Sequence, residues 1–196
     1  MSKTKIYLLG ILTLVAFPLI ALLALYFFAH KSPLEILQLN RVFHPYSILG
    51  IIWGVVFAFI SMRMFSSPSF DVEMKQQRNM ILSLKLNFLD KVFLSFCAGF
   101  GEEILFRSGM QYWCGIWITS IFFIAIHGYL NPKKPKLAIY GLFLIPFIVS
   151  LGYALGTLGL WFCIFAHAAY DLVLFASMKE EEEQVFFKKI RPADSK

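Results

Sequence analysis

Residues 6–29 form a stretch of 24 residues without a charged side chain, preceded by Lys3 and Lys5. About 20 apolar residues in an α-helix are enough to cross the hydrocarbon core of a bilayer. The apolar region of a secretory signal peptide is shorter, about 7–15 residues, and ends at a small-residue cleavage site, which is not evident here. We therefore expect this stretch to be a retained membrane-spanning helix.

The composition of the whole chain points to the same environment. Hydrophobic residues make up 59% of the 196 residues and charged residues 15%, against about 45–50% and about 25% in soluble domains. The formal net charge of +6 does not indicate nucleic-acid binding, because the basic residues lie between apolar stretches and form no single patch. The three cysteines lie within apolar stretches and lack a C-x-x-C spacing, so neither a disulfide framework nor a zinc finger is predicted.

The remaining apolar stretches predict an all-α fold, a polytopic transmembrane bundle with about six spanning helices. Besides residues 6–29, the expected helices cover residues 46–62, 92–110, 113–127, 137–151 and 157–178. The last two come from one charge-free stretch, residues 137–166, which is too long for one crossing and contains Gly152, Gly156 and Gly159 near its expected break. Two small-residue patterns, Gly50-x-x-x-Gly54 and Gly152-x-x-x-Gly156, predict close helix contacts within the bundle, with dimerisation as the less favoured alternative.

The division of the chain and its orientation follow from these helices. Residues 1–87 would hold two spanning helices and a cytoplasmic loop, residues 88–178 a helical core, and residues 179–196 a charged tail. Six crossings place both termini on one side. If that side is the cytoplasm, fifteen of the 18 Lys and Arg residues lie in cytoplasmic segments and only Lys31 and Arg41 lie outside, with Arg107 in the membrane. This distribution is the one that the positive-inside rule favours.

The expected third helix carries three ionisable residues, although a charged side chain at the bilayer centre costs about 2.5–3.5 kcal/mol on insertion scales. Glu103 and Arg107 are four residues apart, share one helical face and can form an ion pair. That structural interpretation leaves Glu102, which points in another direction, without a local partner.

Two other expected helices carry polar residues at a similar depth. His127 ends the fourth, where it could be a simple interfacial histidine, and His167 and Asp171 share a face of the sixth, where a His–Asp hydrogen bond would satisfy both. At 1.5 Å per residue, Glu102 and His127 lie about 18–20 Å from the turn expected near Cys114, and the His–Asp pair lies about 15–21 Å into its helix. Three helices thus bring costly polar groups to one layer, as a water-containing reaction site would require.

A carboxylate and a histidine can hold and deprotonate a water molecule, which is the general-base step of peptide hydrolysis. A second histidine with an aspartate can donate hydrogen bonds to the developing oxyanion. Alternatively, Glu102, His127 and His167 could bind zinc, which lowers the pKa of a bound water to about 7. No serine stands out beside the histidines, and the apolar surroundings of Cys163 would keep its thiol protonated. We therefore expect water to be the nucleophile.

Three short motifs carry these residues. Residues 101–107 read G-E-E-I-L-F-R, an E-E-x-x-x-R pattern, residues 123–127 an F-x-x-x-H pattern and residues 167–171 an H-x-x-x-D pattern. In this order they resemble the motifs of the CPBP family of intramembrane proteases, which includes the CAAX prenyl protease 2 group and bacterial Abi proteins. The resemblance covers about residues 88–178, which would be the catalytic core; the first two helices carry no motif.

The resemblance implies an intramembrane endopeptidase in which Glu102 activates water with the help of His127. Glu103 would pair with Arg107 and brace the helix. The same residues allow a glutamic and a metal-dependent mechanism. We favour the first, with no cofactor required and zinc as the alternative.

By the same resemblance His167 and Asp171 form the oxyanion site, although many relatives have Asn in place of Asp171. The implied substrate is a membrane-tethered protein or hydrophobic peptide that enters from the lipid bilayer, and nucleic acid is not an expected partner. The short chain is typical of a bacterial member, so we expect the inner (cytoplasmic) membrane and cytoplasmic termini.

Two other functions remain open from the residues alone. A small-solute transporter also places carboxylates and histidines inside the membrane, but it predicts inverted repeats, and none is visible. A non-catalytic immunity or binding protein would keep the motifs for stability. Changing Glu102 or His127 to alanine in a processing assay separates this function from proteolysis.

Overall fold

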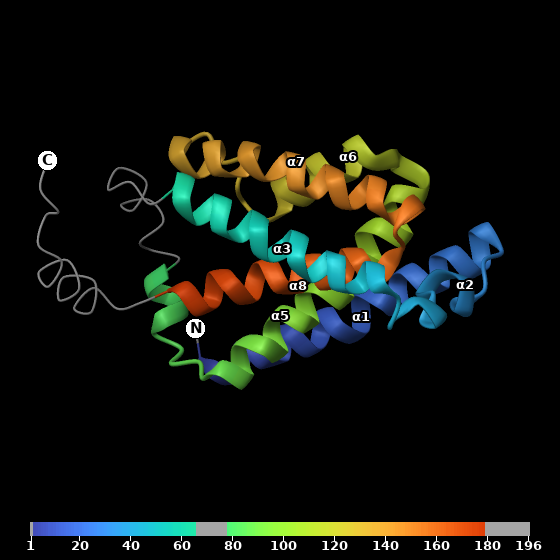
Figure 1. Cartoon of the computed structure of the whole chain (residues 1–196), viewed down its shortest axis with the longest axis horizontal. Helices are drawn as coiled ribbons and strands as arrows, with labels where there is room; N and C mark the ends of the chain where they lie inside the picture. The colour runs from blue at the N-terminus through green and yellow to red at the C-terminus, as the bar shows by residue number, and fades with distance from the viewer. Residues whose placement is uncertain (1, 66–77, 179–196) are drawn as a thin grey trace, which may run out of the picture.

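The structure is a computed structural model that describes residues 2–65 and 78–178 (Figure 1). Within these ranges the chain is helical and has no strand, which confirms the predicted all-α fold. The long helices are α1 (Lys3–Ala29), α3 (Pro45–Met64), α5 (Phe88–Glu103), α6 (Gln111–Ile126), α7 (Pro135–Thr157) and α8 (Leu160–Ser177). Shorter elements are α2 (Pro33–Leu37), the 3₁₀ turn η1 (Leu39–Arg41) and the π-helical η2 (Ile104–Met110). The predicted charged tail, residues 179–196, lies outside the described residues.

Among residues 2–65 and 78–178, five helical stretches are long and apolar enough to cross a membrane, and the third, Phe88–Ile126, has 39 residues. At 1.5 Å per residue this is about twice the 30 Å hydrocarbon thickness. The stretch is broken at Gly115, whose φ of 73° and ψ of 174° are not helical. In Figure 1, α5 and η2 run towards one end of the bundle and α6 runs back. The chain therefore reverses at Gly115, next to Cys114 as predicted. Residues 88–114 are long enough to cross the membrane, whereas the returning helix, residues 116–126, is about 17 Å long and passes through only part of it.

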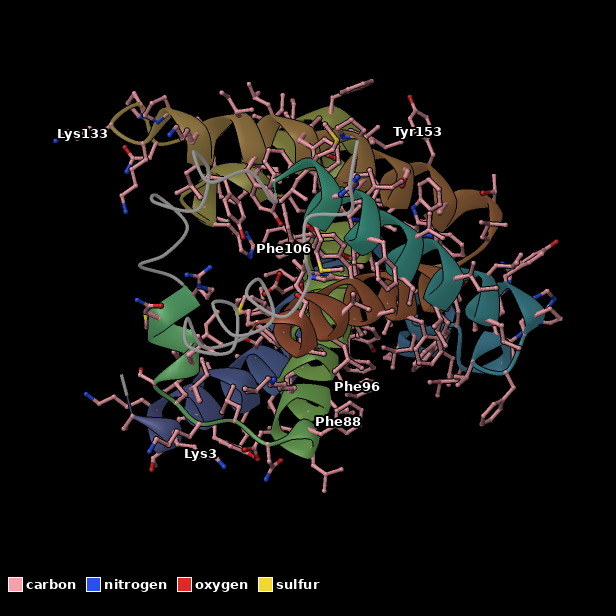
Figure 2. All side chains as sticks on the ribbon, turned by 60° about the vertical axis from the view of Figure 1, so that its left-hand side comes forward. Lys3, Phe88, Phe96, Phe106, Lys133 and Tyr153 are labelled. Carbon is pink, nitrogen blue, oxygen red and sulfur yellow. The ribbon has the colours of Figure 1, made fainter. Side chains whose placement is uncertain are left out.

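The six long helices of the described residues alternate in direction. In Figure 1, α1, α5 and α7 begin at the left-hand end of the bundle, where α3, α6 and α8 end. Lys3 and Lys133 lie at this end in Figure 2, whereas Tyr153 lies towards the other. Lys31 lies just before α2 and Arg41 ends η1, both at the opposite end. Among the described residues, the basic connecting segments thus lie at one end, as the charge pattern predicted. That this end faces the cytoplasm stays a prediction.

The boundary between α7 and α8 differs from the prediction. Helix α7 continues through Gly152 and Gly156 to Thr157, and α8 begins at Leu160. The break falls at Gly159, whose φ of 96° is in the region that glycine adopts at no steric cost. A side chain at Gly156 would meet no described atom within 4 Å. The predicted close contact therefore holds for Gly152, which faces Ile116, and is wrong for Gly156.

Helix α8 lies between α3 and α5 (Figure 1) and is held close to both by glycines. A Cβ atom at Gly54 would lie 2.0 Å from the carbonyl oxygen of Ala166, and one at Gly50 would lie 2.4 Å from that of Phe162. The predicted contact at the first Gly-x-x-x-Gly pattern is therefore confirmed. Gly99 on α5 likewise faces the backbone of α8, at Ile164.

Helix α1 lies along the other side of α5. A Cβ atom at Gly101 would lie 2.1 Å from the carbonyl oxygen of Thr13, so the two backbones touch. At the basic end Asp90, the third residue of α5 and part of its capping box with Asn87, contacts the side chains of Lys3 and Tyr7. In Figure 2, Phe88 and Phe96 point outward from α5, away from these contacts. The two motif-bearing helices α5 and α8 are thus packed from both sides by the helices of the N-terminal part.

Candidate active site

The reversal at Gly115 brings Glu102 next to His127. Glu102 lies at the end of α5, His127 directly follows α6, and Gly115 lies about midway between them in the sequence. The distance from Glu102 Oε2 to His127 Nε2 is 3.4 Å, and the side chains are 14% and 32% exposed. Glu102 Oε2 has no hydrogen-bond partner among the described residues, so this is a close contact and not an aligned hydrogen bond, and it is an ion pair only when His127 is protonated.

The orientation of the His127 ring is set by α6 itself. Nδ1 lies 2.7 Å from the carbonyl oxygen of Phe123, so in the matching tautomer Nδ1–H donates to that carbonyl. The lone pair of Nε2 then faces Glu102. Two proton acceptors thus meet at a partly accessible point of the bundle.

A second set of polar side chains links α5, η2 and α8 and is buried except for Asp171, whose side chain is 24% exposed. Arg107 Nε donates to Glu103 Oε2 at 3.0 Å, and both side chains are 0% exposed. Glu103 Oε1 is 2.9 Å from His167 Nδ1, and His167 Nε2 is 3.6 Å from Asp171 Oδ2. Each contact joins opposite or complementary groups, as burial of charge requires. The predicted Glu103–Arg107 pair is present, and the contact of Glu103 with His167 was not predicted.

Phe123 separates the two sets and touches both. Its ring centroid is 4.4 Å from that of His127 and 5.8 Å from that of His167, and 5.6 Å from the guanidinium carbon of Arg107. The F-x-x-x-H spacing puts Phe123 on the same helical face as His127, so the motif already indicated that Phe123 lies at the site. Its aromatic ring places an apolar wall between the accessible pair and the buried chain.

Tyr129 is a further site residue that the sequence did not reveal. Gly128, with φ of 75°, turns the chain after His127, and the Tyr129 ring then stacks on the His127 ring with centroids 6.1 Å apart and planes within 7°. Burial, together with the nearby Tyr170, Asp171 and Glu102, raises the pKa of the Tyr129 phenol, which therefore stays protonated as a donor. The only available signal was the glycine directly after His127.

The π-helical η2 starts directly after Glu103 and contains Arg107. A π-turn inserts one extra residue into a helical repeat, and such turns are frequent at functional sites. Residues after Glu103 therefore project in directions that a regular repeat would not give. This local widening was not predicted, because no residue type marks it.

The donor set does not form a ready-made zinc site. Within the described ranges, no group of three or more His, Cys, Asp and Glu side chains is placed to hold a metal ion. Glu102 and His127 are adjacent, but His167 directs one ring nitrogen to Glu103 and the other towards Asp171. The three residues considered as zinc ligands thus do not converge on one point.

Comparison with protein families gives one match. Residues 85–173, just under half of the chain, match the Rce1-like family, described as type II CAAX prenyl endopeptidase Rce1-like. The matched range contains all three motifs, so the resemblance that the motifs indicated is confirmed. No curated protein matches the chain, and no solved structure does.

Proposed function

From the membership of residues 85–173 in the Rce1-like family of type II CAAX prenyl endopeptidases, we propose that the chain is an intramembrane endopeptidase acting on a membrane-associated protein or peptide. The family places it among the peptidases, and its apolar helices make it an integral membrane protein. The observation that carries the proposal is the partly accessible Glu102–His127 contact beside the buried chain of Arg107, Glu103 and His167.

Glu102 and His127 are proposed to activate the water. A water molecule beside Glu102 Oε2 and His127 Nε2 can donate one hydrogen bond to each, because both atoms are acceptors. As the water oxygen attacks the carbonyl carbon of the scissile peptide, Glu102 takes its proton. The carbonyl oxygen gains negative charge, and the C–N bond breaks when the proton passes on to the leaving nitrogen. The products are a new carboxylate and a new amine.

His167 and Asp171 are proposed to form the oxyanion site. Nδ1 of His167 is fixed by Glu103 at 2.9 Å, whereas Nε2 is 3.6 Å from Asp171, beyond a hydrogen bond. In the imidazolium form Nε2–H is therefore free to donate to the oxyanion. A fixed donor aimed at developing charge in a dry site stabilises the transition state more than the ground state. Glu103 and Arg107 position this imidazole and do not touch the substrate.

The test replaces Glu102 by glutamine and His127 by alanine. Removal of a general base costs about 10²–10⁴-fold in rate, so we expect loss of cleavage without loss of folded protein. Substrates would be found by comparing the termini of membrane peptides from cells that make the wild type or Glu102→Gln, and kcat/KM would then be measured with purified protein. Glu35→Gln, in the exposed cap of α2, is the matched control and should keep full activity.

Three outcomes would contradict the proposal. Full activity of Glu102→Gln would remove the assigned general base. Activity that disappears on exhaustive chelation and returns with zinc would replace the glutamic mechanism by a metal-dependent one, whereas activity that survives chelation supports the glutamic mechanism. A transporter or immunity protein would yield no difference in peptide termini.

A further inference from the structure

A cavity of about 270 Å³ lies beside Asp171, between α1, α5, α8 and residues 80–86. Its lining is apolar except for Asp171 and Thr13. Figure 1 shows these four segments together at the left-hand, basic end of the bundle. The water-activating residues Glu102 and His127 do not line this cavity, and of the proposed oxyanion site only Asp171 does.

The cavity is lined by the same faces of α5 and α8 that carry the proposed active-site residues Glu102 and His167. On α5, Leu94 and Ala98 line the cavity, and Glu102 is the next residue at the same four-residue spacing. On α8, Asp171 and Phe175 line it and follow His167 at that spacing. Residues four apart lie one above the other on one face of a helix. The cavity therefore begins one helical turn from Glu102 and from His167, on the side of the basic end.

The other two walls come from α1 and from the segment before α5. Ile6, Gly10 and Thr13 line the cavity from one face of α1, and Leu84 lines it from the segment before α5. The contacts of Asp90 with Lys3 and Tyr7 fasten α1 to α5 just beyond this space. The walls are thus held by packed helices.

The cavity is continued on its outer side. A second hollow of about 330 Å³ shares Ile81, Leu86 and Phe175 with it and is also lined by Lys85 and Lys91. The apolar space therefore leads from Asp171 towards the end of the bundle where basic residues lie, and it is not a sealed packing defect.

We propose that this cavity is a specificity pocket that receives the apolar side chains of the peptide substrate next to the scissile bond. The inference rests on the proposed peptidase function. An apolar side chain seated between Leu94 and Ala98 would hold its own peptide group beside Asp171 and within one turn of Glu102. A peptide N–H can donate a hydrogen bond to the Asp171 carboxylate in the wall of the cavity. The acyl chain of a lipid has no such donor, so the lining favours a peptide.

Binding can be tested without turnover. The Glu102→Gln protein in detergent would be irradiated with a hydrophobic decapeptide that carries a diazirine analogue of leucine, and the labelled residues mapped by mass spectrometry. We expect label on the cavity-lining residues of α1 and α5, reduced at least tenfold by excess unlabelled peptide. A phospholipid with a diazirine in its acyl chain is the second probe. Label from the lipid that excess peptide does not displace would show a lipid site and overturn the inference.

Selectivity gives the second test, with fluorogenic decapeptides that differ only in alanine, leucine or phenylalanine at one position. Ala98→Phe fills the cavity and should lower kcat/KM for the leucine and phenylalanine peptides at least tenfold relative to the alanine peptide. Val92→Phe, on the outward side of α5 and outside the lining, is the matched control and should keep the wild-type preference.

The outcomes separate the pocket from the proposed chemistry. Glu102-dependent cleavage with an unchanged preference in Ala98→Phe would overturn the pocket and leave the peptidase function intact. Peptide label in the cavity without any Glu102-dependent cleavage would support the binding site and overturn the peptidase function. Absence of both label and cleavage would overturn both.

Discussion

Arg107 has an unusual environment for a charged residue in a membrane protein. Its side chain is fully buried, and Nε alone contacts Glu103, while Nη1 and Nη2 have no hydrogen-bond partner among the described residues. The ring of Phe123 lies 5.6 Å from its guanidinium carbon and offers a cation–π contact. A buried ion pair is weak support for stability, since desolvation offsets much of the attraction. We therefore interpret the Glu103–Arg107 ion pair as the contact that fixes the Glu103 carboxylate against His167.

Breaking this pair should be costly, whereas removing both charges should be less so. Arg107→Met leaves the Glu103 carboxylate buried without its cation, and loss of one partner of a buried pair costs about 3–5 kcal/mol. We expect a lower unfolding temperature in detergent for Arg107→Met than for the double variant Glu103→Gln, Arg107→Met. Both should lose activity, because the double variant removes the carboxylate that holds His167, and Arg107→Met removes the cation that fixes this carboxylate. An Arg107→Met protein that unfolds at the wild-type temperature would show that the pair does not balance buried charge.

The site residues that belong to a motif, or that are four residues apart on one helix, could be predicted from the sequence. Glu103 and Arg107 are four apart, and that spacing alone predicted their pairing. The contact of Glu103 with His167 depends on how α5 and α8 are rotated about their axes, which no local pattern states. Glu102 was predicted to meet His127 only because both lie equally far from an expected turn, and the structure places them at 3.4 Å.

At the scale of helices, length and hydropathy predicted the elements well and their ends less well. The turn at Gly115 was expected near Cys114, whereas the end of α7 was expected before Gly152 and occurs at Thr157. A glycine inside a helix costs only about 0.5–1 kcal/mol, so packing against neighbours overrides it. Glycine marks a break where its φ is positive, as at Gly159, and the sequence does not show which glycines adopt that conformation.

Two glycines inside helices should respond to alanine in opposite ways. At Gly54 a Cβ atom would lie 2.0 Å from the backbone oxygen of Ala166, so Gly54→Ala must push α3 away from α8. At Gly156 a Cβ atom would meet nothing described within 4 Å, so Gly156→Ala should stabilise α7 by up to about 1 kcal/mol. Thermal unfolding of the two variants in detergent measures both effects. Equal unfolding temperatures would contradict the close α3–α8 contact.

At the scale of the molecule, two features assemble the site. The hairpin at Gly115 joins the E-E-x-x-x-R and F-x-x-x-H motifs, and the placement of α8 between α3 and α5 adds the H-x-x-x-D motif. Glycines on α3 and α5 allow α8 to approach closely on both sides. Residues from both the N-terminal helices and the motif-bearing core thus determine where His167 lies, although the first two helices carry no motif.

The orientation of this bundle in the membrane can be tested with its own cysteines. Cys97 and Cys163 are buried, whereas Cys114 is exposed beside the turn at Gly115, at the end opposite to the basic segments. If the basic end faces the cytoplasm, a membrane-impermeant maleimide added to intact cells should label Cys114. In a Cys114→Ser background, Lys133→Cys should react only after the membrane is permeabilised, because residue 133 lies in the α6–α7 connection at the basic end. Cys114→Ser alone should stay unlabelled until the protein is denatured. Labelling of Lys133→Cys from outside, with Cys114 protected, would invert the bundle and place the active site nearer to the outer surface.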